Sequence, residues 1–226
     1  MTSSSATAAA RFGVTTTNFE RQANNVQYTS PSFSGLTLNA NYGTNTSDSS
    51  LLLGKADTTQ TGLSATFVNG PLIVAAGINS KGLDTEQVTG TSPKAATEIK
   101  SDLNWIGASY NMGAARLFAS HVMREDKDTV AATTTNDVNV TTLGVAVPMG
   151  AYTFNASTYT GKNDATASAT DNTKLSGYQI SARYALSKRT SAYALIGENQ
   201  IKRDSGNTGG TAFKETVTAF GLIHSF

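Results

Sequence analysis

Turn signals recur along this chain at a regular spacing, and this spacing limits the fold more than any other feature. Clusters of Pro, Gly, Asn and Ser mark tight turns roughly 36 to 43 residues apart. Longer polar stretches, rich in Thr, Asn, Asp and Lys, lie between them. A repeat of short turn, strand, long loop and strand is typical of an up-and-down antiparallel β-barrel in a membrane. The tight turns are expected at Ser30–Gly35, Asn69–Pro71, Asn111–Ala114, Pro148–Ala151 and Leu186–Thr190, and the long loops at about 44–60, 80–98, 125–137, 161–173 and 202–213.

The segments between the turns alternate apolar and polar side chains with the two-residue period of a β-strand. In Leu175–Leu186, for example, Tyr178 and Tyr184 share one face and Arg183 lies on the other. In Thr190–Gln200, Tyr193 is expected on one face of the strand and Glu198 on the other. Helix is weakly supported, because β-branched residues, Gly and Asn are frequent and no 3.6-residue pattern persists. The chain is therefore predicted to be all-β.

The carboxy-terminal segment Val217–Phe226 reads as one strand that stops on an aromatic residue. Soluble proteins rarely finish on such a strand, because a bare apolar edge recruits other chains. A strand that meets lipid needs an apolar face turned outward, with aromatic residues near the water boundary. The segment therefore predicts a membrane strand that also serves as an assembly signal, carried by Phe220, Leu222, His224 and Phe226.

Hydrophobic residues make up 38% of the chain and charged residues only 15%. Few charges argue against a well-solvated soluble surface, and few apolar residues argue against a large core. Both shortages fit a sheet with lipid on one side and water on the other. No apolar run approaches the roughly eighteen residues that a helical span needs.

The sequence holds no sign of catalysis, a metal site or a cofactor. Familiar nucleophile, phosphate-binding and zinc motifs are absent. The two histidines, His121 and His224, are far apart and have no acidic partner at a ligand spacing. A net charge of +1 gives no reason to expect nucleic-acid binding, and there is no cysteine. The chain is expected not to be an enzyme.

The strand count is about eleven, or twelve if Ala8–Thr16 adds one more, and each strand is long enough to cross a bilayer. Residues 1–20 are a poorly defined amino-terminal segment, and residues 21–226 form the predicted barrel region. Either an incomplete barrel or a closed twelve-stranded barrel fits this count. The rival fold is a secreted or surface β-sandwich, or fibre segment, that binds a ligand through its loops.

Most charges are expected in the long loops, and the strand bodies hold few. A lipid-facing charge costs about 2–4 kcal/mol at the bilayer midplane, so these few should face the water-filled side. Glu198 and Arg183 are both assigned to the non-aromatic face. The tyrosines are expected to form aromatic girdles at the two membrane boundaries. The pore-lining candidates are Arg21, Arg116, Arg183 and Glu198, and the girdle candidates, with Phe226, are Tyr110, Tyr178, Tyr184 and Tyr193.

Three motifs resemble the general diffusion porins of β-proteobacteria. Arg21–Gly35 (RQANNVQYTSPSFSG) is similar to the family's Arg, Asn-Asn, Tyr and Ser-Pro-x-Phe-x-Gly stretch. Tyr184–Tyr193 (YALSKRTSAY) resembles its turn before the penultimate strand. Phe220–Phe226 (FGLIHSF) resembles its terminal motif, with Ile223 in place of the usual basic residue. The resemblance is to the carboxy-terminal two-thirds of such a protein.

This resemblance implies an incomplete part of a sixteen-stranded, transmembrane β-barrel in the outer membrane of a Gram-negative bacterium. It implies a water-filled channel for passive diffusion of small hydrophilic solutes, with a preference for anions to which Arg21 contributes. The implied partners are the lipid bilayer with its lipopolysaccharide, the outer-membrane assembly machinery and, for a complete barrel, two further copies in a homotrimer.

Overall fold

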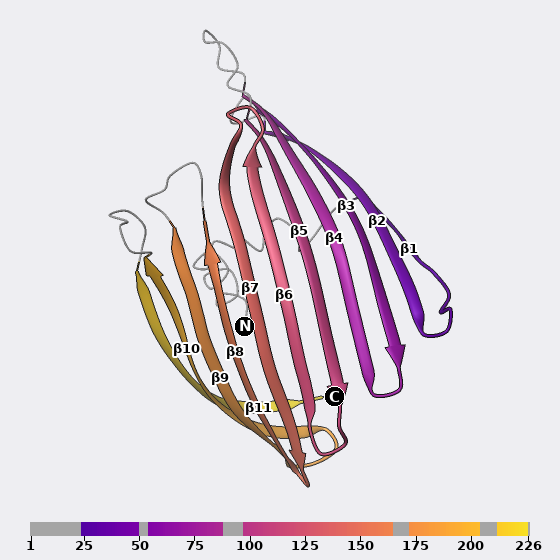
Figure 1. Ribbon diagram of the computed structural model, residues 1–226, viewed down its shortest axis with the longest axis vertical. Coiled ribbons are helices and arrows are strands. Elements are labelled where there is room, and N and C mark those ends of the chain that lie inside the picture. Colours follow the sequence, from indigo (N-terminus) through magenta and orange to yellow (C-terminus); the bar gives the residue numbers. More distant parts are fainter. Residues whose placement is uncertain (1–23, 50–53, 88–96, 165–171, 204–211, 226) are drawn as a thin grey trace.

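The computed structural model describes residues 24–49, 54–87, 97–164, 172–203 and 212–225. These residues form one antiparallel sheet of eleven strands in chain order, β1 to β11 (Figure 1). The strands are β1 (Asn25–Thr29), β2 (Leu36–Ser49), β3 (Gly54–Asn69), β4 (Leu72–Gln87), β5 (Thr97–Asn111), β6 (Arg116–Asp128), β7 (Thr133–Met149), β8 (Tyr152–Asn163), β9 (Thr173–Ala185), β10 (Thr190–Arg203) and β11 (Phe213–His224).

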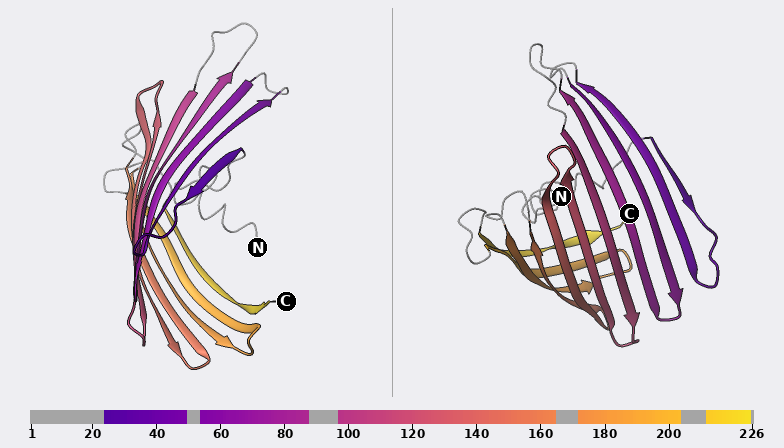
Figure 2. Two further views of the ribbon diagram at one scale, coloured as in Figure 1. Left: turned by 90° about the vertical axis from the view of Figure 1, so that its right-hand side faces the viewer. Right: turned by 45° about the horizontal axis from the view of Figure 1, so that its top comes forward.

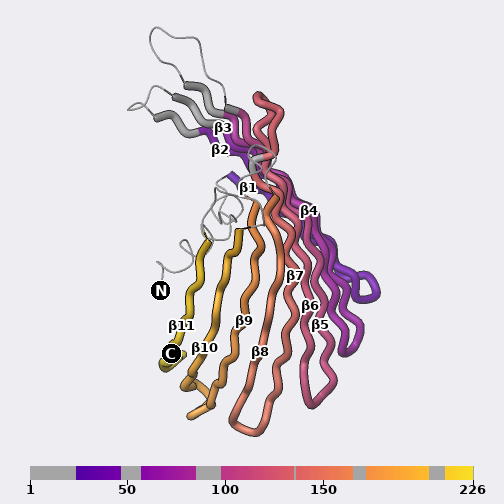
Figure 3. Tube along the Cα trace, turned by 60° about the vertical axis from the view of Figure 1, so that its left-hand side comes forward, coloured from indigo at the N-terminus to yellow at the C-terminus, as the bar shows by residue number. Residues whose placement is uncertain are grey.

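The sheet is a single curved layer. Figure 2 shows it bent like a section of a barrel wall, and Figure 3 shows the strands following one another in chain order. Within the described ranges there is no second sheet, so the β-sandwich interpretation is wrong. Among the described strands the sheet does not close, because β1 pairs only with β2 and β11 only with β10. In the same ranges, no helix is long and apolar enough to cross a membrane.

The five predicted tight turns are confirmed at one end of the sheet, called here the short-turn end. They connect β1 to β2, β3 to β4, β5 to β6, β7 to β8 and β9 to β10. At two of the tightest, Gly70 and Gly150 have φ values of 55° and 62°. Only glycine enters this left-handed region without steric cost, which explains the glycine in these two turns.

The strands extend further than the sequence predicts at the opposite end, called here the loop end. The predicted loop 125–137 is mostly strand, because β6 continues to Asp128 and β7 begins at Thr133. Charges expected in loops therefore stand on strands, including Arg124, Lys162 and Lys174. The strands were predicted to end where polar side chains become frequent, but the alternation of the two faces continues through these polar residues.

The pairing register divides the sheet into two faces, because residues directly opposite each other point the same way. One rung joins Ile78 to Asn104 and Met123, and another joins Ala156 to Ile180 and Ile196. The face that contains these rungs is called the apolar face. Its large exposed side chains include Leu38, Leu63, Ile78, Ile106, Tyr110, Leu117, Leu143, Tyr152, Phe154, Tyr178, Ile180, Tyr184, Ile196, Phe220 and Leu222.

The other face, called the polar face, carries Asn, Ser, Thr, Gln and Gly in most rungs, such as Asn155–Ser181 and Gly62–Asn79. Side chains on the concave side of a curved sheet converge, and those on the convex side spread apart. The buried side chains of the described residues all lie on the polar face, so this face is the concave one. They are Gln60, Ser101, Arg124, Asp126, Val138, Leu175, Ser191 and Ile201.

Candidate functional site

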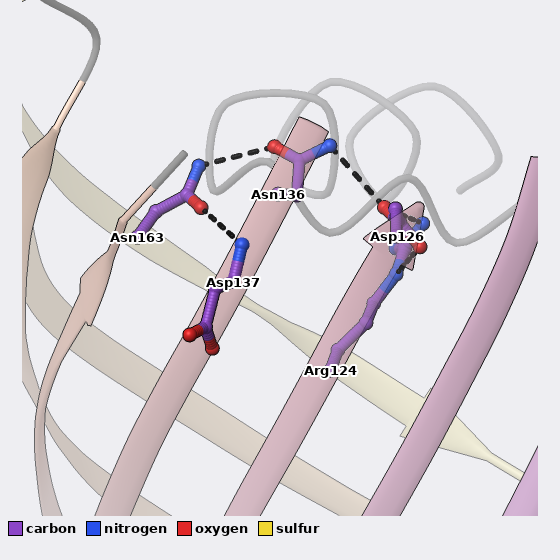
Figure 4. Close-up of polar contacts among 5 residues, drawn as sticks. All are labelled: Arg124, Asp126, Asn136, Asp137 and Asn163. Carbon is purple, nitrogen blue, oxygen red and sulfur yellow. Dashed lines mark hydrogen bonds and ion pairs between the residues drawn. The ribbon is translucent and has the colours of Figure 1, made fainter. Parts of the chain in front are cut away.

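The candidate site is the polar, concave face, and a network of side-chain hydrogen bonds crosses it near the loop end (Figure 4). Two residues apart on β6, Arg124 and Asp126 share this face and form a bidentate pair. The Arg124 Nε donates to Asp126 Oδ1 at 2.9 Å, and Nη2 donates to Oδ2 at 2.7 Å. The Asn136 amide donates to Asp126 Oδ2 at 3.2 Å, and the Asn163 amide donates to Asn136 Oδ1 at 3.1 Å. The network links β6, β7 and β8.

The Arg124–Asp126 pair is buried, with side-chain exposures of 1% and 6%. A buried ion pair persists only when geometry and further hydrogen bonds offset its desolvation. The planar fork of arginine matches a carboxylate, and Asn136 supplies an additional donor. The pair therefore contributes little net charge to the concave face and acts as a rigid polar brace across the wall.

Two predicted pore-lining residues, Arg116 and Arg183, lie on the polar face at the short-turn end. Arg116 is opposite Asn111 and Ala146, and Arg183 is opposite Thr153 and Tyr193. The Arg183 Nε donates to Ser191 Oγ at 2.9 Å. Both residues are exposed, so their charges reach the water on the concave side. The third arginine of the prediction, Arg21, lies outside the described residues.

The predicted placement of Glu198 on the same face as Arg183 is wrong. Glu198 is opposite Tyr178 and Thr216, so it lies on the apolar face, where Lys214 Nζ is 3.1 Å from its Oε1. It is near the loop end, where this face becomes charged. Alternation within β10 alone could not identify its outward face, because both faces carry apolar residues, and the register with β9 decides it.

The predicted place of Tyr193 in the aromatic girdle is also wrong, because the two faces of β10 were assigned the wrong way round. Tyr193 is opposite Arg183 and Gly221 and lies on the polar face. A Cβ built on Gly221 would be 2.9 Å from the Tyr193 ring, so the ring covers the glycine closely. An aromatic ring laid over a cross-strand glycine fills the space of the missing side chain.

Aromatic residues lie opposite glycines at three other rungs of the polar face. Trp105 covers Gly77 and Tyr159 covers Gly177, with Cβ approaches of 2.7 Å and 2.5 Å, and Phe118 approaches Gly144 at 3.6 Å. The Trp105 and Tyr159 rings therefore lie over the neighbouring strand, in the space that a side chain at the glycine would fill. Sequence reasoning missed these pairs, because only the register shows that each aromatic faces a glycine.

The other predicted girdle residues, Tyr110, Tyr178 and Tyr184, do lie on the apolar face. Tyr110 and Tyr184 are near the short-turn end, and Tyr178 is nearer the loop end. Tyr152, which the sequence analysis did not select, has its ring centroid 4.6 Å from that of Tyr184. Tyrosines at two levels, with aliphatic side chains between them, match the layout of a membrane-crossing strand.

The last strand presents its predicted side chains outward. Phe220 and Leu222 are 87% and 70% exposed on the apolar face, and His224 shares it through its register with Thr190. The Thr190 Oγ1 lies 2.9 Å from His224 Nδ1, which ties the end of β11 to the start of β10. Phe226 lies outside the described residues, and the assembly-signal role of this strand remains a prediction.

Among the described residues, no group of three or more His, Cys, Asp or Glu side chains could hold a metal ion. The concave face instead presents hydrogen-bonding groups and separated charges along its length. Such a wall can hydrate and guide a solute. A sequence model of the Gram-negative porin family matches residues 1–204 of the chain.

The chain belongs to the Gram-negative porin family. It is therefore a protein of the Gram-negative outer membrane, and its antiparallel strands are transmembrane β-strands. The family assignment confirms the resemblance inferred from the three motifs. No curated protein matches the chain.

Solved structures share the fold of this porin. An anion-selective porin from Comamonas acidovorans superposes with a TM-score of 0.68 at 23% identity, over 91% of this chain and 60% of that one. OmpT of Vibrio cholerae, folded in vitro, superposes with a TM-score of 0.67 at 14% identity, over 88% of this chain and 63% of OmpT. A trimer form of OmpT superposes with a TM-score of 0.63 at 14% identity, over 89% of this chain and 63% of OmpT. The chain thus spans about three-fifths of the length of these relatives.

Proposed function

We propose that this chain forms part of the wall of a water-filled channel, through which small hydrophilic solutes diffuse passively across the outer membrane. The observation that carries the proposal is the separation of the two faces. Large aliphatic and aromatic side chains are exposed on the convex face, whereas the concave face is polar. Exposed apolar surface of this extent needs lipid, and a polar concave wall needs water.

The channel prefers anions. On the described concave face the basic side chains outnumber the acidic ones, and Arg124 is neutralised by Asp126. Exposed arginines such as Arg116 and Arg183 raise the local concentration of anions by long-range attraction. Arg21 is proposed to add to them. The porin from Comamonas acidovorans that shares this fold is anion-selective, which agrees with a preference for anions. The basic residues are Lys81, Arg116, Arg124, Arg183 and Arg203, and the acidic ones are Asp126, Asp128 and Glu215.

The two free edges of the described sheet set a condition on this function. Backbone groups of β1 and β11 that face lipid without a partner each cost several kcal/mol. The functional barrel therefore includes further strands that pair with both edges. We propose that the complete barrel assembles as a homotrimer, as the trimer form of OmpT does, and that the terminal strand β11 is recognised by the outer-membrane assembly machinery.

Conductance across a planar bilayer tests the channel directly. Purified protein should produce stepwise conductance increases in KCl, and a salt gradient should give a reversal potential of the sign for anion selectivity. Membrane insertion without any conductance would contradict the channel, and a cation-selective reversal potential would contradict the anion preference.

A further inference from the structure

A small pocket lies on the polar face, where the strands β8 to β11 run side by side. Its volume is about 220 Å³, below the roughly 300–1,000 Å³ of pockets for drug-sized ligands, so it suits one small ring. It is called here the wall pocket. Its lining side chains are Ser157, Tyr159, Gln179, Leu195, Asn199 and Val217.

A glycine leaves the wall pocket open. Gly197 is directly opposite Gln179 on one side and Val217 on the other, so a side chain is missing at the centre of this rung. Leu195 and Asn199, two residues away on β10, share its face and border the gap. A Cβ built on Gly197 would be 2.8 Å from a carbonyl oxygen of β9, so a side chain there would force the backbone to shift.

Hydrogen-bonding groups in the wall pocket are available to a solute. Ser157 and Gln179 are exposed, and neither side chain forms a hydrogen bond with another described residue. The Tyr159 hydroxyl donates to Asn199 Oδ1 at 3.1 Å, which leaves the Asn199 amide nitrogen as a further donor. Together, the hydroxyl and amide groups supply both donors and acceptors.

The wall pocket is also partly apolar. Leu195 and Val217 provide aliphatic surface, and Tyr159 provides an aromatic ring. Ligand pockets usually combine such surface with a few polar groups that fix the orientation of the ligand. A sugar ring matches this combination, because it has hydroxyl groups around its edge and C–H groups on its faces.

The charges around the wall pocket argue against a charged ligand. Glu198 is also at its border, but the Glu198 side chain lies on the apolar face, where Lys214 pairs with it. On the polar face, Glu215 is in the next rung toward the loop end, and Arg183 is two rungs away toward the short-turn end, about 13 Å. A charged ligand would therefore lose its water without gaining an ion pair with the lining side chains, which is costly.

We propose that the wall pocket binds one ring of an uncharged sugar or similar polyol. The hydroxyl groups of the ring bind Ser157, Gln179 and Asn199, and a C–H face packs on the apolar side chains. The inference rests on the proposed function, because the polar face must border water that contains the solute. It adds a class of neutral solutes held by contact, whereas the exposed arginines attract anions at a distance.

Saturation-transfer NMR of the folded full chain, in a zwitterionic detergent without a sugar head group, tests the proposal. The probe is D-glucose, compared with D-glucuronate and D-glucosamine, which place a negative or a positive charge on the same ring. The Kd for glucose should be about tenfold lower than the Kd for either charged sugar, because the pocket leaves their charges unpaired. No binding of glucose, or binding of glucuronate as tight as that of glucose, would overturn the proposal.

The variant Ser157→Ala/Gln179→Leu removes two hydrogen-bonding groups from the wall pocket and should raise the Kd for glucose about tenfold. The matched control is Ser120→Ala/Gln27→Leu, which makes the same changes on the same face, on β6 and β1. The control should bind glucose as the unaltered protein does. A loss of the same size in both variants would show contact with the polar face in general and would refute the pocket.

The single variant Gln179→Glu gives a second test, because it keeps the size of the side chain and adds a carboxylate. It should bind glucosamine more tightly than glucose, and an unchanged order of the three sugars would place the binding elsewhere. Conductance separates the pocket from the channel. Conductance without glucose binding contradicts only the pocket, whereas glucose binding without conductance contradicts only the channel.

Discussion

At the scale of single residues, the structure separates charges that are buried within the wall from charges that are exposed on its concave side. Arg124 and Asp126 are buried against each other and brace three strands. Arg116 and Arg183 are exposed on the same face. The sequence could not distinguish these groups, because all four residues follow the same alternation and their burial depends on neighbouring strands.

Substitution Asp126→Asn should destabilise the folded protein by about 3–5 kcal/mol, since it removes the carboxylate that binds the buried Arg124 guanidinium through two hydrogen bonds. Urea unfolding in lipid vesicles would measure this loss. The double substitution Arg124→Met/Asp126→Leu should recover most of the stability, because it removes both charges. A double variant no more stable than Asp126→Asn would contradict the brace.

Glycines under aromatic rings give a second residue-scale prediction. A Cβ at Gly177 would lie 2.5 Å from the Glu198 carbonyl oxygen and 2.5 Å from the Tyr159 ring, so Gly177→Ala must shift backbone and should cost about 1–3 kcal/mol. At Gly107, on the same face, the nearest atom is 3.7 Å away, and Gly107→Ala should be nearly neutral. Equal urea midpoints for the two variants would argue against the ring-over-glycine packing.

At the scale of the strand, the sequence predicts existence and order well and boundaries poorly. The turns were found because Gly, Pro and Asn are needed there, as Gly70 and Gly150 illustrate. The loop-end extensions were missed because polar strands that rise beyond the lipid resemble loops. In β10, Tyr193 and Leu195 suggested the wrong outward face, since only pairing with β9 shows that Ile196 points outward.

The facing of β11 can be tested by neighbouring lysine substitutions. Phe220→Lys would place a charge on the lipid side, at a cost of about 2–4 kcal/mol near the midplane, whereas Ala219→Lys would place it on the polar side. Outer-membrane yield and resistance of the folded form to heating in detergent should fall for Phe220→Lys and stay close to normal for Ala219→Lys. A larger loss for Ala219→Lys than for Phe220→Lys would show that β11 turns its other face to the lipid.

At the scale of the whole molecule, the sign of charge on the concave face should set the ion selectivity of the proposed channel. Arg183→Glu changes the wall by two charges and should shift the reversal potential in a KCl gradient toward cation selectivity. Lys188→Glu makes the same charge change in a short turn at the membrane edge and should shift it less. Equal shifts for the two variants would remove Arg183 from the channel wall.

The assignment of lipid to one face and water to the other can be measured on three consecutive residues of β9. The chain has no cysteine, so single cysteines can be placed at Gln179, Ile180 and Ser181 without background. In protein inserted in vesicles, positions 179 and 181 should react with a charged, water-soluble thiol reagent. Position 180 should resist that reagent, and a fluorophore attached there should be quenched by brominated lipid. Uniform reaction at all three positions, or quenching at 179 and 181 instead of 180, would contradict a barrel wall between lipid and a water-filled channel.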